Sequence, residues 1–138
     1  MSTTEVQYGS LREKIRAEKA EREAAYANFE RVSQLAHEKG HEAATAVTPT
    51  PMVVQGYEDT PVMDGICGFG WIWFKGNTRW GRWAKKNLGA GKSYPDGLQI
   101  WVGDYNQSYT RKAEYARAYA QVLREELGVD AYGKSRVD

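Results

Sequence analysis

Two histidines four positions apart form the sharpest chemical motif in this 138-residue chain. The run His37-Glu38-Lys39-Gly40-His41 matches the H-E-x-x-H pattern, in which two imidazoles bind zinc and the glutamate polarises a zinc-bound water. A third protein ligand must come from elsewhere, and Glu58 is the nearest candidate because the chain has no other histidine. The charge of Lys39 and the helix-ending tendency of Gly40 weaken the match. A zinc metallopeptidase is therefore kept as a third hypothesis, and no metal-binding or catalytic residue is predicted.

A second phrase, Gly89-Ala90-Gly91-Lys92-Ser93, ends like a phosphate-binding loop. That loop requires a further glycine at position 86, where this chain has Lys86, and it stands between a strand and a following helix. Here a predicted helix precedes the phrase and a predicted strand follows it. The reversed order excludes a nucleoside triphosphatase of this type. Cys67 lies among apolar residues and is interpreted as a small core residue rather than a nucleophile.

Basic and aromatic side chains are interleaved between residues 62 and 122. This interval holds nine basic residues, four acidic residues and all five tryptophans. Because basic side chains contact phosphates and aromatic faces stack on bases, the composition suits single-stranded nucleic acid. The alternative is that Trp80 and Trp83, which share a helical face with Ala84, belong to the core and leave an ordinary solvated face. The predicted nucleic-acid-binding residues are Lys75, Arg79, Arg82, Lys85, Lys86, Lys92, Arg111 and Lys112, with Arg117 nearby.

The elements that position these residues begin with one long helix. The spacing predicts it from Ser10 to Lys39, with Ser10 as N-cap, Glu13 completing a capping box and Gly40 as the stop. Its first half is strongly charged and is expected to be solvated, while its second half is expected to dock. An Ala/Thr/Pro-rich stretch follows. The predicted organisation is a charged helix over 1–40, a linker over 41–64 and a compact domain over 65–138.

The compact domain opens with a period-two pattern over Ile66 to Lys75. Cys67, Phe69, Trp71 and Trp73 fall on one strand face, and the opposite face carries two glycines with Ile72 and Phe74. The glycines leave room for a crossing helix or a neighbouring strand, or alternatively for a ligand. A short helix capped by Asn77 or Thr78, a strand from 98 to 105, a helix ending at Gly128 and a strand over 129–137 follow. This β-α-β-α-β order predicts a small two-layer domain of the α+β or α/β class.

Composition excludes several classes of protein. Lys and Arg total 19 and Asp and Glu total 18, so the net charge of +1 argues against a protein that acts through whole-molecule charge. A single cysteine excludes an internal disulfide framework and a cysteine-based structural zinc site. No apolar stretch approaches the ~18 residues that span a bilayer. The sequence therefore predicts a soluble intracellular protein with no membrane partner.

Four segments together resemble a family of small phage- and prophage-encoded proteins of unassigned function. They are Thr48–Val54, Asp64–Trp71, Gln107-Ser108 with Arg111–Ala116, and Ser135–Asp138. The resemblance covers residues 48–138 and implies a viral gene product located in the host cytoplasm or the virion. It implies no reaction, cofactor or catalytic residue.

These observations support three hypotheses for function. The first is a non-enzymatic phage accessory protein that binds nucleic acid, or a host or virion protein, through the basic Trp-rich region. The second is a virion or homo-oligomeric structural protein that assembles through the helix over residues 10–39. The third is the metallopeptidase based on the histidine pair. No cofactor is predicted.

Overall fold

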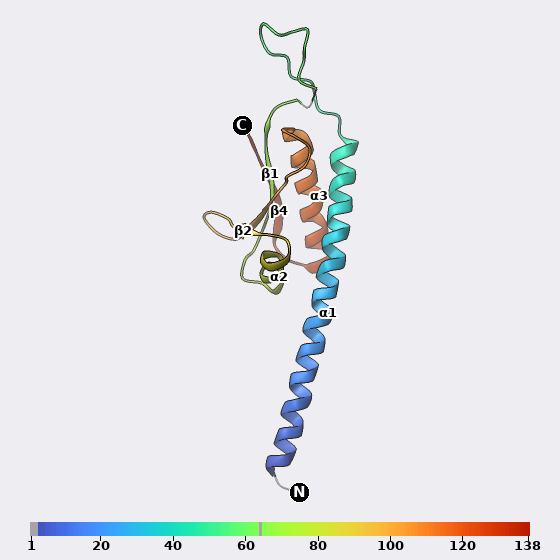
Figure 1. Ribbon diagram of the computed structural model, residues 1–138, viewed down its shortest axis with the longest axis vertical. Coiled ribbons are helices and arrows are strands. Elements are labelled where there is room, and N and C mark those ends of the chain that lie inside the picture. The colour runs from blue at the N-terminus through green and yellow to red at the C-terminus, as the bar shows by residue number, and fades with distance from the viewer. Residues whose placement is uncertain (1–2, 64) are drawn as a thin grey trace. The chain divides into compact units, whose positions relative to one another are not determined.

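The computed structural model describes residues 3–63 and 65–138, with side chains described from residue 9 onward. Within these described residues, three helices and four strands follow one another along the chain (Figure 1), and the class is α+β as predicted. The chain divides into two compact units, residues 1–31 and residues 32–138. The elements are α1 (Thr3–Ala46), β1 (Gly68–Phe74), α2 (Arg79–Asn87), β2 (Gly91–Lys92), β3 (Leu98–Trp101), α3 (Tyr109–Leu127) and β4 (Ala131–Val137).

The described part of the first unit, residues 3–31, is the first part of α1. From Gly9 to Ala24 every residue of this helix is exposed, including Leu11 at 53% and Ile15 at 55%. The predicted solvated half of the helix is therefore confirmed. The predicted start at Ser10 is wrong, since the helix already begins at Thr3. No proline precedes Ser10, and Gly9 inside a helix costs only ~1 kcal/mol relative to alanine, so nothing stops the helix there.

In the second unit, α1 buries one residue per turn. Val32, Ala36, Gly40 and Ala44 are all buried, which confirms the predicted docking of this half of the helix. A Cβ atom at Gly40 would lie 2.7 Å from Cδ2 of Tyr115. The glycine therefore allows close packing against α3, and the prediction that it ends the helix is wrong.

The helix instead continues to Ala46. Pro49 then disfavours helical backbone at the residue before it, which gives the chain a local reason to leave the helix here. In the following segment, the backbones of Met52 and Val62 exchange hydrogen bonds of 2.9 and 2.8 Å. These bonds close a loop whose tip exposes several apolar side chains, among them Tyr57 at 69%.

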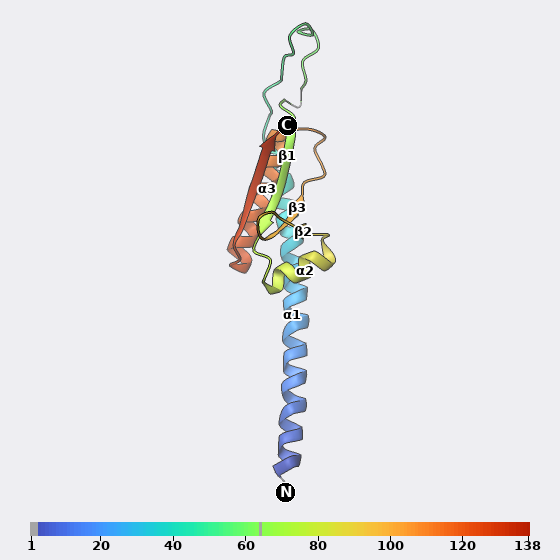
Figure 2. The ribbon, with the colours of Figure 1, turned by 90° about the vertical axis from the view of Figure 1, so that its left-hand side faces the viewer.

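The four strands form one antiparallel sheet in the order β2-β3-β1-β4. The connectivity β1-α2-β2-β3-α3-β4 with this strand order is the split β-α-β, or ferredoxin-like, arrangement. The predicted order of helices and strands is confirmed, with β2 as an addition. This strand has only two residues, too few to show an alternating pattern. Figure 2 shows β1 and β4 in front of α3, which covers one face of the sheet.

The covered face of β1 is the one that carries its glycines. Gly68, Gly70, Ile72 and Phe74 are buried in alternation, as the period-two pattern predicts. A Cβ atom at Gly70 would lie 2.8 Å from the carbonyl oxygen of Lys112, in α3. The glycines therefore make room for a crossing helix and not for a ligand on this side of the sheet.

Both shorter helices begin at side-chain caps. The hydroxyl of Thr78 accepts a hydrogen bond from the Gly81 backbone N–H at 2.9 Å and caps α2, as predicted. The hydroxyl of Ser108 accepts one from the Arg111 backbone N–H at 3.3 Å and caps α3. Gly128 ends α3 with a φ of 65°, a left-handed conformation that glycine adopts without strain.

Candidate functional site

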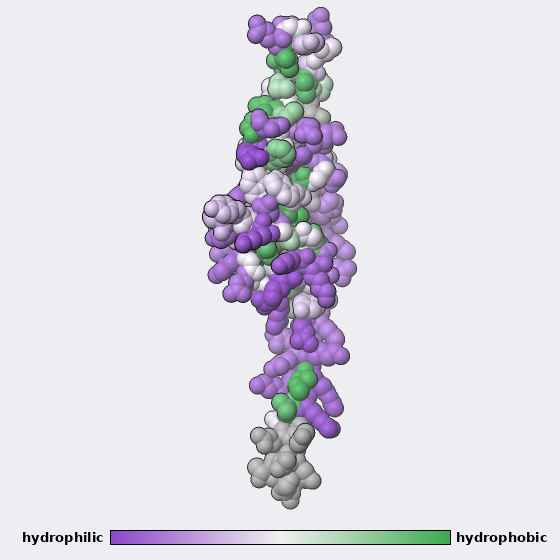
Figure 3. Space-filling view, turned by 60° about the vertical axis from the view of Figure 1, so that its left-hand side comes forward, coloured by the Kyte–Doolittle hydropathy of each residue, from purple (hydrophilic) through white to green (hydrophobic). Residues whose placement is uncertain are grey.

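The sheet face opposite α3 carries an unusual concentration of aromatic and basic side chains. In the antiparallel register Trp71 stands opposite Trp101 on one side and Lys134 on the other. Directly opposed residues point to the same face of a sheet, so the register defines the set of residues on this face. Figure 3 shows this side of the molecule as a mixture of pale, weakly polar residues and purple, strongly hydrophilic ones. We call this set the open face: Phe69, Trp71, Trp73, Gln99, Trp101, Tyr132, Lys134 and Arg136.

Two rings of the open face are largely available to solvent. Trp101 is 55% exposed and Tyr132 is 50% exposed. Trp101 packs against Trp71 with ring centroids 5.2 Å apart, and Tyr132 stacks on Trp73 at 6.2 Å with an interplanar angle of 24°. Each exposed ring is thus supported by a half-buried tryptophan of β1. Exposed aromatic surface of this extent on a sheet is typical of a binding site.

Three cations lie over rings of this face. The Lys134 ammonium is 5.2 Å from the centroid of Trp73, and the Arg136 guanidinium is 5.3 Å from that of Phe69. Arg124, from the last turn of α3, lies 5.4 Å from the centroid of Tyr132. A cation over an exposed ring contributes only ~0.5–1 kcal/mol, so these side chains can exchange a ring for a stronger anionic partner.

The indole of Trp73 is held in place before any ligand arrives. Its Nε1–H donates to the backbone carbonyl of Asp96 at 2.9 Å. Gly97 follows, with a φ of 80°, and packs directly against the indole ring, where a Cβ atom would overlap Nε1. The loop before β3 therefore fixes this ring, which reduces the entropy lost when something stacks or packs against it.

The surface predicted around α2 is only partly formed. Lys75, Arg79, Arg82, Lys85, Lys86 and Lys92 are all exposed, as that prediction requires. Trp80, however, is only 1% exposed and packs edge-on to Phe74 at 5.8 Å. The alternative interpretation of Trp80 as a core residue is therefore confirmed. The cations of α2 are exposed, but the ring of Trp80 is not available for a base to stack on.

The two cations predicted on α3 make internal contacts instead. Arg111 donates from Nη1 to the backbone carbonyl of Ala44 at 2.9 Å, which ties the end of α1 to α3. Lys112 is only 7% exposed, and its Cβ lies against Gly70. Neither contact is visible in the sequence, because each joins residues that are far apart along the chain.

Sequence reasoning missed Trp101, Tyr132, Lys134 and Arg136 as members of one site. A signal was present, because Tyr132, Lys134 and Arg136 alternate with small residues in the predicted final strand. The strand register that sets them beside Trp73, Trp71 and Phe69 was not predictable from that alternation. The open face is thus a second aromatic and basic surface, and binding by the six exposed cations around α2 stays a prediction.

The histidine pair takes part in helix packing. His37 and His41 stack with centroids 6.4 Å apart on α1, and their Nδ1 atoms lie 2.6 and 2.9 Å from the hydroxyls of Tyr115 and Tyr105. Burial raises the pKa of both tyrosines, so each hydroxyl keeps its proton and can donate it to a neutral imidazole. Within the described residues, no group of three or more His, Cys, Asp or Glu side chains is placed to hold a metal ion. Glu58 therefore does not complete a site with the histidines.

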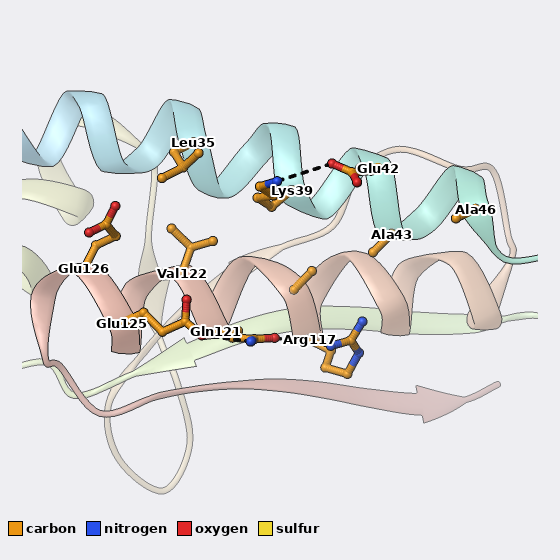
Figure 4. Close-up of a pocket in the computed structure, with 11 residues that line it drawn as sticks. Leu35, Lys39, Glu42, Ala43, Ala46, Arg117, Gln121, Val122, Glu125 and Glu126 are labelled. Atoms are coloured by element: carbon orange, nitrogen blue, oxygen red, sulfur yellow. Dashed lines mark hydrogen bonds and ion pairs between the residues drawn. The ribbon is translucent and has the colours of Figure 1, made fainter.

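A groove of ≈ 390 Å³ runs between α3 and residues 35–46 of α1 (Figure 4). Leu35 and Val122 point toward one another across it. On its rim, the Lys39 ammonium pairs with the Glu42 carboxylate at 3.6 Å. Two amphipathic helices that pack together commonly place apolar side chains between them and charged side chains at the edges. We therefore interpret this groove as part of the packing of α1 on α3.

Comparisons of the chain with protein-family models, with curated proteins and with solved structures each found no match. Among the described residues, none of the helices combines the length and the apolar character that crossing a membrane requires. The assignment of a function therefore rests on the geometry of the open face.

Proposed function

We propose that this protein is a non-enzymatic phage accessory protein that binds single-stranded nucleic acid on the open face of its sheet. One observation carries the proposal: the two half-exposed rings of Trp101 and Tyr132 flank β1, with Arg124 over Tyr132 and Lys134 over the neighbouring ring of Trp73. The viral origin is part of the proposal and is supported by the resemblance of residues 48–138.

Base stacking supplies the affinity in this proposal. A base stacked on an aromatic side chain contributes ~1–3 kcal/mol, largely independent of sequence. Trp101 on β3 and Tyr132 on β4 are separated by β1, so the two rings are about 9–10 Å apart across the strands. Neighbouring bases of a duplex are only ~3.4 Å apart and shield each other's faces. The spacing therefore favours a single strand whose bases are unstacked.

The cations supply the contacts to phosphate. Lys134, Arg136 and Arg124 are all exposed, and each can turn from its ring toward a phosphate as a base approaches. With two or three phosphates neutralised, log K falls against log salt with a slope of roughly −1.4 to −2.1 for a single strand. A moderate salt dependence is therefore expected in addition to the contribution from stacking.

The test is fluorescence anisotropy with a labelled 12-nucleotide mixed-sequence strand, as DNA and as RNA, and with the corresponding duplexes. The full-length protein is expected to bind the single strands more tightly than the duplexes. Trp101→Ala is expected to weaken binding about 5- to 150-fold, the loss of one stacking contact. Tyr57→Ala removes a more exposed ring from the loop and is expected to leave the affinity unchanged.

A second pair of variants separates the open face from the surface predicted around α2. The double variant Lys134→Glu with Arg136→Glu is expected to abolish most of the binding. The double variant Lys85→Glu with Lys86→Glu is expected to change the affinity less than about threefold. If the α2 double variant lost binding while the open-face double variant and Trp101→Ala kept the wild-type affinity, the site would lie on α2. Absence of binding to every strand would refute the proposal in favour of a host or virion protein as partner.

Assembly through the N-terminal helix is a second candidate function, supported by the exposed Leu11 and Ile15 one turn apart on a charged helix. Because Val32 and Ala36 are buried in the second unit, the part of the predicted arm that is open to pairing lies before residue 32. Light scattering of the full chain is expected to show an oligomer that Leu11→Glu with Ile15→Glu converts to a monomer. A monomeric wild-type protein would refute this candidate.

A further inference from the structure

A hollow of ≈ 440 Å³ adjoins the open face at the end of β1. Its volume lies in the range of pockets that bind small molecules. Four different segments line it: the end of β1, the approach to α2, the loop before β3 and the turn between α3 and β4. The residues that line it are Trp73, Lys75, Asn77, Asp96 and Asp130, with Gly76 and Gly97.

Trp73 connects the hollow to the open face. Its indole stacks with Tyr132 on the open face and also forms one wall of the hollow. The hydrogen bond from Nε1 to the Asp96 carbonyl and the contact with Gly97 fix that wall. A strand whose bases stack on the open face would therefore place its next base at the mouth of a preformed hollow.

The polar lining combines two carboxylates with one amide and the ammonium of Lys75. Asp96 and Asp130 each bring a carboxylate, which only accepts when ionised, and Asn77 brings an amide with one acceptor and two donor hydrogens. Within the described part of the chain, no side-chain hydrogen bond or ion pair occupies these three groups. Their acceptors are available to a ligand that presents N–H groups.

Nucleobases differ in this property. Cytosine and adenine carry an exocyclic amino group that donates two hydrogens, and Asp or Glu characteristically accepts from the amino group of cytosine, as Asn does from adenine. Thymine and uracil present a carbonyl at the corresponding position, which a carboxylate repels. The two carboxylates outnumber the single ammonium of Lys75, so the net negative charge of the lining disfavours phosphates. In this arrangement the hollow admits the edge of a base while the backbone stays beside Lys134 and Arg136.

We infer that this hollow is a base-recognition subsite that selects a nucleobase with an exocyclic amino group over thymine or uracil. The inference rests on the proposed function. Asp96, Asp130 and Asn77 determine the specificity of the subsite, and Trp73 is its rigid wall.

The test compares two pyrimidines of nearly equal size and stacking strength. Full-length protein is titrated with labelled 12-nucleotide oligo-dC and oligo-dT at two salt concentrations, and the expected preference for oligo-dC is at least about fivefold at both. Asp96→Asn with Asp130→Asn is expected to remove that preference. Asp59→Asn changes an exposed carboxylate in the loop and is expected to preserve it.

The outcomes separate this inference from the proposed function. Equal affinity for oligo-dC and oligo-dT, with both weakened by Trp101→Ala, would overturn the subsite and leave the stacking face in place. A double variant that binds both oligonucleotides more tightly while keeping the preference would show that the carboxylates act only through charge, which also overturns it. If neither oligonucleotide binds, the proposed function itself fails.

Discussion

Gly70 is the position at which one methyl group can test how closely α3 approaches the sheet. A Cβ atom there would lie 2.8 Å from the carbonyl oxygen of Lys112 and 2.9 Å from its carbonyl carbon. Favourable contacts between such atoms begin near 3.5 Å, so Gly70→Ala requires a shift of several tenths of an ångström. Because two of the obstructing atoms are helix backbone, they cannot move aside by a side-chain rotation, and α3 itself must shift.

The expected cost follows from two opposing effects. Overpacking a well-packed contact costs ~1–3 kcal/mol, whereas replacing glycine by alanine restricts the unfolded chain and returns ~0.4–1 kcal/mol. Gly70→Ala is therefore expected to lower the free energy of unfolding by about 0–2.6 kcal/mol, with a central value of about 1.3 kcal/mol. For a chain of this length, the central value corresponds to a decrease in Tm of roughly 5 °C.

The assay is thermal and urea denaturation followed by circular dichroism. Gly91→Ala is the matched control, because it makes the same change in the same sheet at a position with no heavy atom within 4 Å of the new Cβ. That variant is expected to be neutral or slightly stabilising. If Gly70→Ala were as stable as Gly91→Ala, α3 would not approach β1 this closely, and the glycines of β1 would need another explanation.

Two further predictions concern α3. Burial raises the pKa of Tyr119 above its usual value of about 10, so the folded protein holds this proton more tightly than the unfolded chain, and stability falls as the pH rises above about 10. Tyr119→Phe is expected to reduce the loss of Tm that calorimetry measures between about pH 9 and pH 11. The control Tyr57→Phe is expected to leave that loss unchanged, and equal losses in the two variants would refute the argument. Ser108→Ala removes the side chain of the fully buried N-cap of α3 and is expected to cost ~1 kcal/mol in urea denaturation. Ser108→Gly is the comparison, because glycine at an N-cap costs only about 0.3 kcal/mol and adds no volume. An unchanged midpoint for the alanine variant would show that the cap contributes nothing.

Much of the local structure was predictable because its signals are local. The alternation over β1 predicted which residues share a face, and Thr78 and Gly128 predicted helix ends through their capping chemistry. The error at Gly40 has the opposite character. A glycine in a helical sequence reads as a stop, but Tyr115, 75 positions later in the sequence, explains why it lies inside the helix. A contact between residues so far apart along the chain produces no periodic pattern in a single sequence, so it could not be predicted.

The candidate site shows the same division. The sequence showed that tryptophans and cations are interleaved, and from it we predicted a binding surface around α2. The structure shows that Trp80 of this helix is a core residue. The site on the open face depends on β4, whose pairing with β1 brings Lys134 beside Trp71. Strand order and register are set by the packing of the complete sheet, so the cations of the last strand could not be assigned to the tryptophans of the first.

The sequence by itself determined most of the elements, the N-cap of α2, the end of α3 and the two faces of β1, because hydrophobic periodicity and capping act over a few residues. Only the tertiary structure decided which face of β1 is covered. Both faces are rich in large apolar side chains, with Ile72 and Phe74 on one and Trp71 and Trp73 on the other. The helix can approach only where Gly68 and Gly70 leave room for its backbone, and this steric condition buries one face and leaves the tryptophan face to solvent.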